Sequence, residues 1–138
     1  MKHFTDKELR IVGAPKNIID NMHLLVEKVL DPFREKIGVP IVVNSGYRSP
    51  EYNKSVGGVP TSQHCKGEAT DIVPKMNIRK AFEILIDNFE FDQAIYEDRG
   101  DSIWIHVSYC KGKNRKQALH ANKVKGVWEY APYKRIVK

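Results

Sequence analysis

The sequence contains few cysteines and no long apolar run. Its two cysteines, Cys65 and Cys110, form neither a disulfide framework nor a CxxC pair, so reduced thiols are expected. No stretch approaches the roughly 18 apolar residues of a membrane span, and the first residues, MKHFTDKELRIVG, lack the apolar core of a secretory signal. We therefore expect synthesis in the cytoplasm without a signal peptide, with release by another route if the protein acts outside the cell.

The size and the charge of the chain exclude fewer kinds of protein than the lack of a membrane span or a secretory signal does. At 138 residues, with 41% hydrophobic residues, the chain is long enough for one core, and we expect a single domain over residues 1–138. The 23 Lys and Arg residues exceed the 17 Asp and Glu residues, and the net charge of +6 favours an anionic partner. The basic segment KGKNRKQ is short and has no interleaved aromatic residues, so nucleic acid is not the expected partner.

Periodic apolar residues predict two amphipathic helices, at residues 16–37 and 77–89. Pro32 is a candidate kink in the first helix, Gly38 a candidate stop, and Asn77 the cap of the second. Short β-branched segments predict strands. These are VPIVVN, EATDIV, the hairpin arms FDQAIYE and SIWIHVSYC, and a candidate strand in the tail GVWEYAPYKRIVK. The expected fold is α+β, with helices on one face of an antiparallel sheet of four or five strands.

The longest irregular region, SGYRSPEYNKSVGGVPTSQH, is rich in Gly, Ser and Pro. One or two helical turns are expected within it, capped by Ser49 with Pro50 at the first helical position. Long ordered loops in compact domains are usually functional, so the site is expected at this loop.

Three residues at or near the end of this loop have the side chains of a catalytic zinc site, which takes three protein ligands and leaves a fourth position for water. His64 ends the loop and Asp71 lies in the strand that follows. His106 lies in the second hairpin arm, where Ile103, Ile105 and Val107 alternate with it and predict that it faces away from the core. A loop, its following strand and a neighbouring strand can bring the three side chains to one point.

The residues between the first two candidate ligands are small or polar. We expect Gly67 and Ala69 to leave room for a metal, and Ser62 and Gln63 to support the ligands by hydrogen bonds. A histidine and an aspartate at this spacing often occur together by chance. The interpretation as metal ligands therefore depends on the small and polar residues around them.

The segments SGYRSPEYNKSVGGVPTSQHCKGEATDI and WIHVSY together resemble the zinc D-alanyl-D-alanine carboxypeptidases. That group includes the vancomycin-resistance dipeptidase and phage peptidoglycan endopeptidases, and its fold is shared with lysostaphin-type enzymes and the hedgehog signalling domain. The family pattern is an SGYR segment, then SxHxxGxAxD, then a late-strand histidine, and the likeness runs from about residue 16 to residue 110. The resemblance implies the same α+β fold, with a zinc site on the sheet face opposite the helices.

The resemblance also assigns roles to individual residues. It makes His64, Asp71 and His106 the zinc ligands, and Arg48 the arginine that contacts the substrate carbonyl as it becomes an oxyanion. Close relatives carry the general base three residues before the last histidine, where this chain has Ile103. We therefore take Glu97 as the base, because it ends the first hairpin arm as a glutamate does in the hedgehog-like branch. Asp101 is the alternative, although turn chemistry alone also explains an acid there.

The implied activity is zinc-dependent hydrolysis of peptide bonds in peptidoglycan stem peptides, as a D,D-carboxypeptidase or as an endolysin-type endopeptidase. In the implied mechanism Glu97 takes a proton from water activated by zinc, and Arg48 stabilises the oxyanion. The expected partner is the stem peptide, bound by a monomer without nucleic acid and without stable membrane association. A phage-type lysin, acting on the cell wall after release, fits these features. The alternative is a zinc-containing binding domain of the same fold that has lost turnover, as the residue at position 103 would allow.

Overall fold

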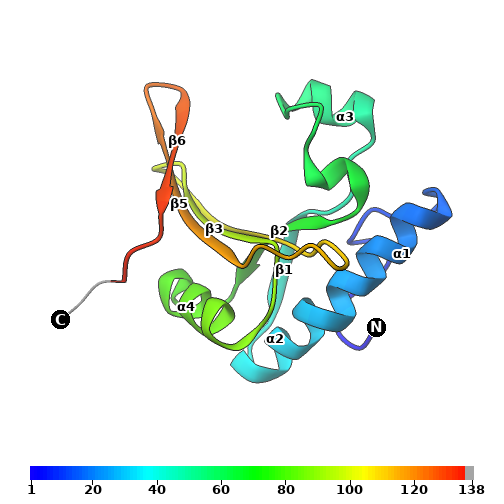
Figure 1. Ribbon diagram of the computed structural model, residues 1–138, viewed down its shortest axis with the longest axis horizontal. Helices are drawn as coiled ribbons and strands as arrows, with labels where there is room; N and C mark the ends of the chain where they lie inside the picture. Colours follow the sequence, from blue (N-terminus) through cyan, green and yellow to red (C-terminus); the bar gives the residue numbers. More distant parts are fainter. Residues whose placement is uncertain (136–138) are drawn as a thin grey trace.

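The first helical segment follows the predicted apolar period. In the computed structural model, which describes residues 1–135, α1 (Lys16–Leu25) continues through a π-helical turn, η1 (Val26–Leu30), into α2 (Asp31–Ile37) (Figure 1). The predicted irregularity at Pro32 takes the form of this wider turn just before it, because proline has no amide hydrogen to donate and its ring crowds the preceding turn. The segment ends at Gly38, whose φ of 68° closes it in the left-handed conformation.

Six strands form one sheet in the order β1-β2-β4-β3-β5-β6. Their bounds are β1 Ile41–Ser45, β2 Ala69–Pro74, β3 Gln93–Asp98, β4 Ile103–Ser108, β5 Gln117–Val124 and β6 Val127–Pro132. All neighbouring strands are antiparallel except β3 and β5, which are parallel. The α+β class and the mainly antiparallel sheet are confirmed, whereas the sheet has six strands and not the four or five expected.

The additional strand is β5, which begins at the last residue of the basic segment KGKNRKQ, in a stretch where no helix or strand was expected. Its residues Ala118, His120 and Asn122 have little β propensity, so the segment carries a weak strand signal. The sequence signal for the hairpin lies at the end of β5, where Lys125 and Gly126 stand between two valines. In the structure these two residues have positive φ values, 51° for Lys125 and 80° for Gly126, which is the geometry of a two-residue hairpin turn. The candidate strand in the tail forms as β6; residues 136–138 of that tail lie outside the described residues.

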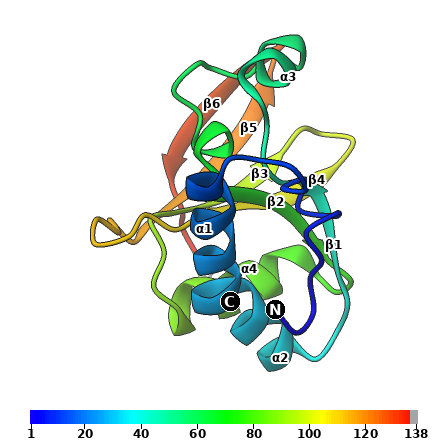
Figure 2. The ribbon, with the colours of Figure 1, turned by 90° about the vertical axis from the view of Figure 1, so that its right-hand side faces the viewer.

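The remaining helices lie on opposite sides of the sheet. The helix α4 (Ile78–Asn88), capped by the Asn77 side chain as predicted, lies with α2 on one side. The short helix α3 (Pro50–Ser55), capped by Ser49, and the tip of the β5–β6 hairpin project from the other side (Figures 1 and 2). None of the described helices combines the length and apolar character needed to cross a membrane.

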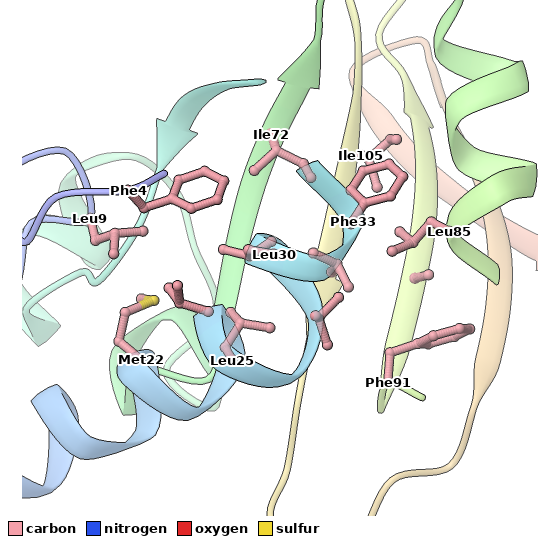
Figure 3. Packing of buried hydrophobic residues seen from close by; sticks show 14 of the residues in the cluster. Phe4, Leu9, Met22, Leu25, Leu30, Phe33, Ile72, Leu85, Phe91 and Ile105 are labelled. Atoms are coloured by element: carbon pink, nitrogen blue, oxygen red, sulfur yellow. The ribbon is translucent and has the colours of Figure 1, made fainter. Parts of the chain in front are cut away.

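The core lies between the sheet and the helices α1, α2 and α4 (Figure 3). Met22, Leu25 and Leu30 of the first helical segment are fully buried, together with Phe33 and Leu85. Ile72 of β2 and Ile105 of β4 supply the sheet side of this core. Because side chains alternate along a strand, the residues beside these two isoleucines must face the opposite side of the sheet, which the core helices leave uncovered.

Candidate metal centre

The two central strands carry two of the predicted ligands at one level of the sheet. Asp71 of β2 pairs directly with His106 of β4, while their neighbours Ile72 and Ile105 pair on the core side. The register therefore puts both polar side chains on the face opposite the core helices. His106 Nδ1 lies 3.1 Å from Asp71 Oδ1.

His64 reaches the same point from η2, a 3-10 turn formed by Gln63–Lys66. Its Nδ1 lies 2.9 Å from the carbonyl oxygen of Gly46, which can only accept a hydrogen bond, so Nδ1 carries the hydrogen. The other ring nitrogen, Nε2, then has a free lone pair and faces Asp71 Oδ1 at 3.3 Å. A side chain at Gly46 would lie 2.2 Å from the carbonyl oxygen of Leu9, so glycine is required where this acceptor is placed.

The three predicted ligands form a compact donor set. Candidate ligand atoms of His64, Asp71 and His106 all lie within 4.8 Å of one another. Burial acts to raise the pKa of Asp71, but the two neighbouring histidines, chiefly through the hydrogen bond from His106, outweigh it and hold that pKa well below its usual range. The carboxylate is therefore ionised at neutral pH, and two imidazole nitrogens with one carboxylate oxygen make a set that suits Zn²⁺. The cluster could hold a metal ion.

Glu97 lies beside this cluster. It belongs to β3, pairs with Trp104 of β4, and places Oε1 4.0 Å from His106 Nδ1. Only 14% of its side chain is exposed, and this burial, assisted by the negative charge of Asp71 and opposed by His106, raises its pKa to about 7. A carboxyl group that titrates near neutrality can both accept and return a proton at physiological pH.

Asp101, the alternative base, lies elsewhere. It occupies the turn between β3 and β4, its side chain is 72% exposed, and Arg99 Nε donates to its carboxylate at 2.8 Å. The structure thus brings Glu97 to the three candidate ligands and leaves Asp101 in the exposed turn.

Arg48 is fixed at the edge of the cluster by three side chains. Its Nε donates to Ser45 Oγ at 3.1 Å, and its two terminal nitrogens donate to Asn53 Oδ1 at 3.4 Å and Asp71 Oδ2 at 3.3 Å. Asn53 is 2% exposed and also donates to the Val59 carbonyl at 2.7 Å, so it ties the guanidinium to the following loop. Sequence reasoning missed Asn53, because an asparagine inside a short helix carries no pattern of its own.

The small and polar residues around His64 have different roles from those expected. Gly67 has a φ of 70°, and a side chain there would lie 2.5 Å from the Ile18 carbonyl oxygen, so it makes room for helix α1 and not for a metal. Ser62 Oγ accepts from the His64 amide at 3.2 Å and holds the 3-10 turn. Gln63 instead donates to Asp92, whose carboxylate also pairs with Arg115 and has its pKa lowered to about 2, chiefly by that arginine.

The cluster opens into a cavity of about 1050 Å³ on the same face of the sheet. One wall includes the loop after α3, with Val56 and Val59, and the other includes Trp128 and Tyr130 of the β5–β6 hairpin (Figure 1). Sequence reasoning missed these two aromatic residues. Their spacing by two in a strand, which puts both on one face, was the available signal.

Comparison with known proteins gives one family. No curated protein matched the chain. The family model described as Peptidase M15 matches residues 2–108, which include every residue of the metal cluster as well as Arg48 and Glu97, and exclude β5 and β6. That match covers most of the 138 residues and agrees with the sequence motifs and with the α+β fold. The chain therefore belongs to the peptidase M15 family.

Proposed function

We propose that the protein is a zinc-dependent peptidase that hydrolyses peptide bonds in peptidoglycan stem peptides. One observation carries the proposal: a compact His64, Asp71 and His106 donor set shares one open cavity with Glu97, whose pKa is raised to about 7. A metal-ligand cluster beside a carboxyl group that titrates at neutral pH is the arrangement that hydrolysis by activated water requires.

Each residue of the site has one task in this reaction. His64, Asp71 and His106 would hold the zinc ion, which when bound supplies Lewis acidity that makes water a better nucleophile at neutral pH. Glu97 accepts the proton of the water that attacks the substrate carbonyl, and then returns it to the leaving amine. Its burial keeps this proton exchange next to the reacting atoms and out of bulk water.

Arg48 stabilises the negative charge that develops on the substrate carbonyl oxygen. Its three hydrogen bonds hold the guanidinium in place before substrate binds, so little reorganisation is needed during the reaction. An arginine that merely paired with Asp71 would not need the further contacts to Ser45 and Asn53. A lysine would not reproduce them, because a single ammonium group lacks the planar fork of donors.

The family and the net charge support the proposed substrate class. The net charge of +6 favours an anionic polymer such as the cell wall, and the open cavity of about 1050 Å³ has the volume to hold a short peptide. We propose a stem peptide with D-alanine or another D-residue near the cleaved bond. Release of a terminal residue would identify a D,D-carboxypeptidase, and cleavage within a stem or cross-link an endopeptidase.

Digestion of purified peptidoglycan, with mass analysis of the released muropeptides and metal analysis of the protein, tests the proposal. We expect zinc in the purified protein and new termini in the digest. Glu97→Gln should lower the rate by about a hundredfold or more, because the proton acceptor is lost. Asp101→Asn is the matched control and should retain activity, since that side chain is exposed in the turn. Unchanged lysis by the Glu97 variant would refute the base assignment, and absence of any bound or activating divalent metal would refute the proposal as a whole.

A second candidate function is a zinc-holding domain that binds stem peptides without cutting them. The observation that favours it is Ile103, which packs against the core at the position where close relatives carry the catalytic carboxylate. Tight binding to peptidoglycan by the zinc-loaded protein, with no new termini after prolonged digestion, would identify this function.

A further inference from the structure

The β5–β6 hairpin presents a side chain to the metal centre from outside the part of the chain that matches the family. Strand register defines a row of four residues across the sheet: Trp104 of β4 pairs with Glu97 of β3, Glu97 with Ala121 of β5, and Ala121 with Tyr130 of β6. Residues paired in this way have their side chains on the same face. Tyr130 therefore points to the face that carries Glu97.

The residue between Glu97 and Tyr130 determines whether their side chains can share one space. Two strand spacings separate their backbones by about 10 Å, a gap that a larger side chain between them would fill. Ala121 occupies that position, is fully buried, and extends only a methyl group above the sheet. The phenol ring of Tyr130 can thus lean over Ala121 toward Glu97, and both residues line the same cavity.

The electrostatic environment of Tyr130 supports this placement. Partial burial, together with the negative charges of Glu97 and Asp71, raises the pKa of the phenol above its usual range. The hydroxyl therefore remains protonated throughout the pH range in which the peptidase would work, and it can donate a hydrogen bond. Tyr130 is 57% exposed and lines the cavity, so its hydroxyl is accessible to a bound ligand.

We propose that Tyr130 contacts the substrate, donating a hydrogen bond from its hydroxyl to a carbonyl or carboxylate oxygen of the bound peptide. The strand order places this contact on the flank of the metal centre opposite Arg48, because Arg48 follows the edge strand β1 and Tyr130 lies in the other edge strand, β6. A peptide lying over the cluster would then be held on both sides. The inference rests on the proposed peptidase function and adds to it a specificity contact made by the hairpin.

The effect of Tyr130→Phe on substrate binding tests this contact, because the variant removes only the hydroxyl and the side chain is exposed enough for the fold to tolerate it. The affinity of the zinc-loaded Glu97→Gln protein for a synthetic stem peptide ending in D-alanine is measured by calorimetry, with and without Tyr130→Phe. Loss of one hydrogen bond should weaken binding about three- to tenfold. Tyr52→Phe is the matched control, because Tyr52 lies on α3 and its hydroxyl contacts Arg10 at 3.4 Å. That control should bind like its parent.

Kinetics on the active protein give the second readout: with the Glu97 carboxylate present, Tyr130→Phe should raise KM by a similar factor. Equal affinity of the Tyr130 and Tyr52 variants would overturn the contact while leaving the peptidase proposal intact. Failure of the wild-type protein to cut the peptide would count against peptidase activity, and the affinity ratio would still decide the role of Tyr130. Absence of any binding to the stem peptide would refute both.

Discussion

Glu97 is the residue at which the proposed function and the stability of the fold conflict. Its carboxyl group is buried next to Asp71, and its pKa rises from 4.5 to about 7 on folding. Below pH 4.5 the group is neutral in the folded and the unfolded chain, so it adds no cost. Between pH 4.5 and about 7 the unfolded chain is ionised while the folded protein keeps the proton, so the free energy of unfolding falls across this window and stays lower above pH 7.

We predict that Glu97→Gln stabilises the metal-free protein at pH 8 and changes little at pH 4. The gain should reach up to about 3 kcal/mol, because one pKa unit corresponds to about 1.4 kcal/mol. Denaturant unfolding at both pH values measures it. Glu90→Gln serves as the exposed control and should show no gain. Equal stability of the Glu97 variant and the wild type at pH 8 would mean that the carboxylate is solvated in the folded protein.

The residues of the site differ in how far sequence alone could identify them. His64, Asp71 and His106 were predictable, since their types suit zinc and strand alternation predicted the face of His106. The contributions of Asn53 and Tyr130 were not, because each depends on which segments lie together in space. Asn53 contacts Arg48, and Tyr130 comes to the face that carries Glu97 only because β5 pairs with β3 and β6 pairs with β5.

At the scale of elements, Gly67 connects the ligand-bearing turn to the first helix. It ends η2 with a φ of 70°, and a side chain there would lie 2.5 Å from the backbone of Ile18. Gly38 ends α2 with nearly the same φ, 68°, and has open space around it. Substituting each glycine by alanine therefore distinguishes two costs in unfolding free energy: backbone strain, which both positions share, and steric overlap, which only Gly67 has.

We predict that Gly67→Ala lowers the free energy of unfolding by about 2–4 kcal/mol, the sum of left-handed strain and overpacking. Gly38→Ala should cost only about 1 kcal/mol, from strain alone. Denaturant unfolding of both variants against the wild type measures the difference. If the two losses are equal, α1 moves aside readily and does not fix the position of His64.

The elements themselves were predictable where one segment carries its own signal. The apolar period of the first helix, the Asn77 cap and the Ser49 cap all lie in continuous sequence, and each was found in the structure. The strand β5 was not found from sequence, since its pairing with β3 depends on a partner far along the chain. Its polar residues become a strand through tertiary pairing rather than through propensity.

At the scale of the whole molecule, the candidate metal centre joins three segments: the turn η2 and the strands β2 and β4. These segments have no reason to stay together in the unfolded chain. A metal ion held by all three would bind the folded state selectively, and mass action then raises the free energy of unfolding.

We predict that zinc at a hundred times its dissociation constant stabilises the protein by about 2.7 kcal/mol, and that a chelator removes the effect. Calorimetric or optical melting should show a rise in Tm of roughly 5–10 °C. His106→Ala should abolish the rise, whereas His23→Ala should retain it, because His23 lies on α1 and pairs with Asp6. A rise that survives in the His106 variant would locate the zinc at a different site.

The parallel pairing of β5 with β3 has a consequence for how the protein opens. The hairpin adds to a sheet in which β2 and β4 already carry two of the three candidate ligands. Its outer strand β6 is an edge strand and has mostly exposed residues. Such peripheral units unfold locally at lower free energy than the core. Amide hydrogens of β5 and β6 should therefore exchange with solvent before those of β2 and β4. Each such opening would remove one wall of the cavity while the strands that carry the candidate ligands remain folded.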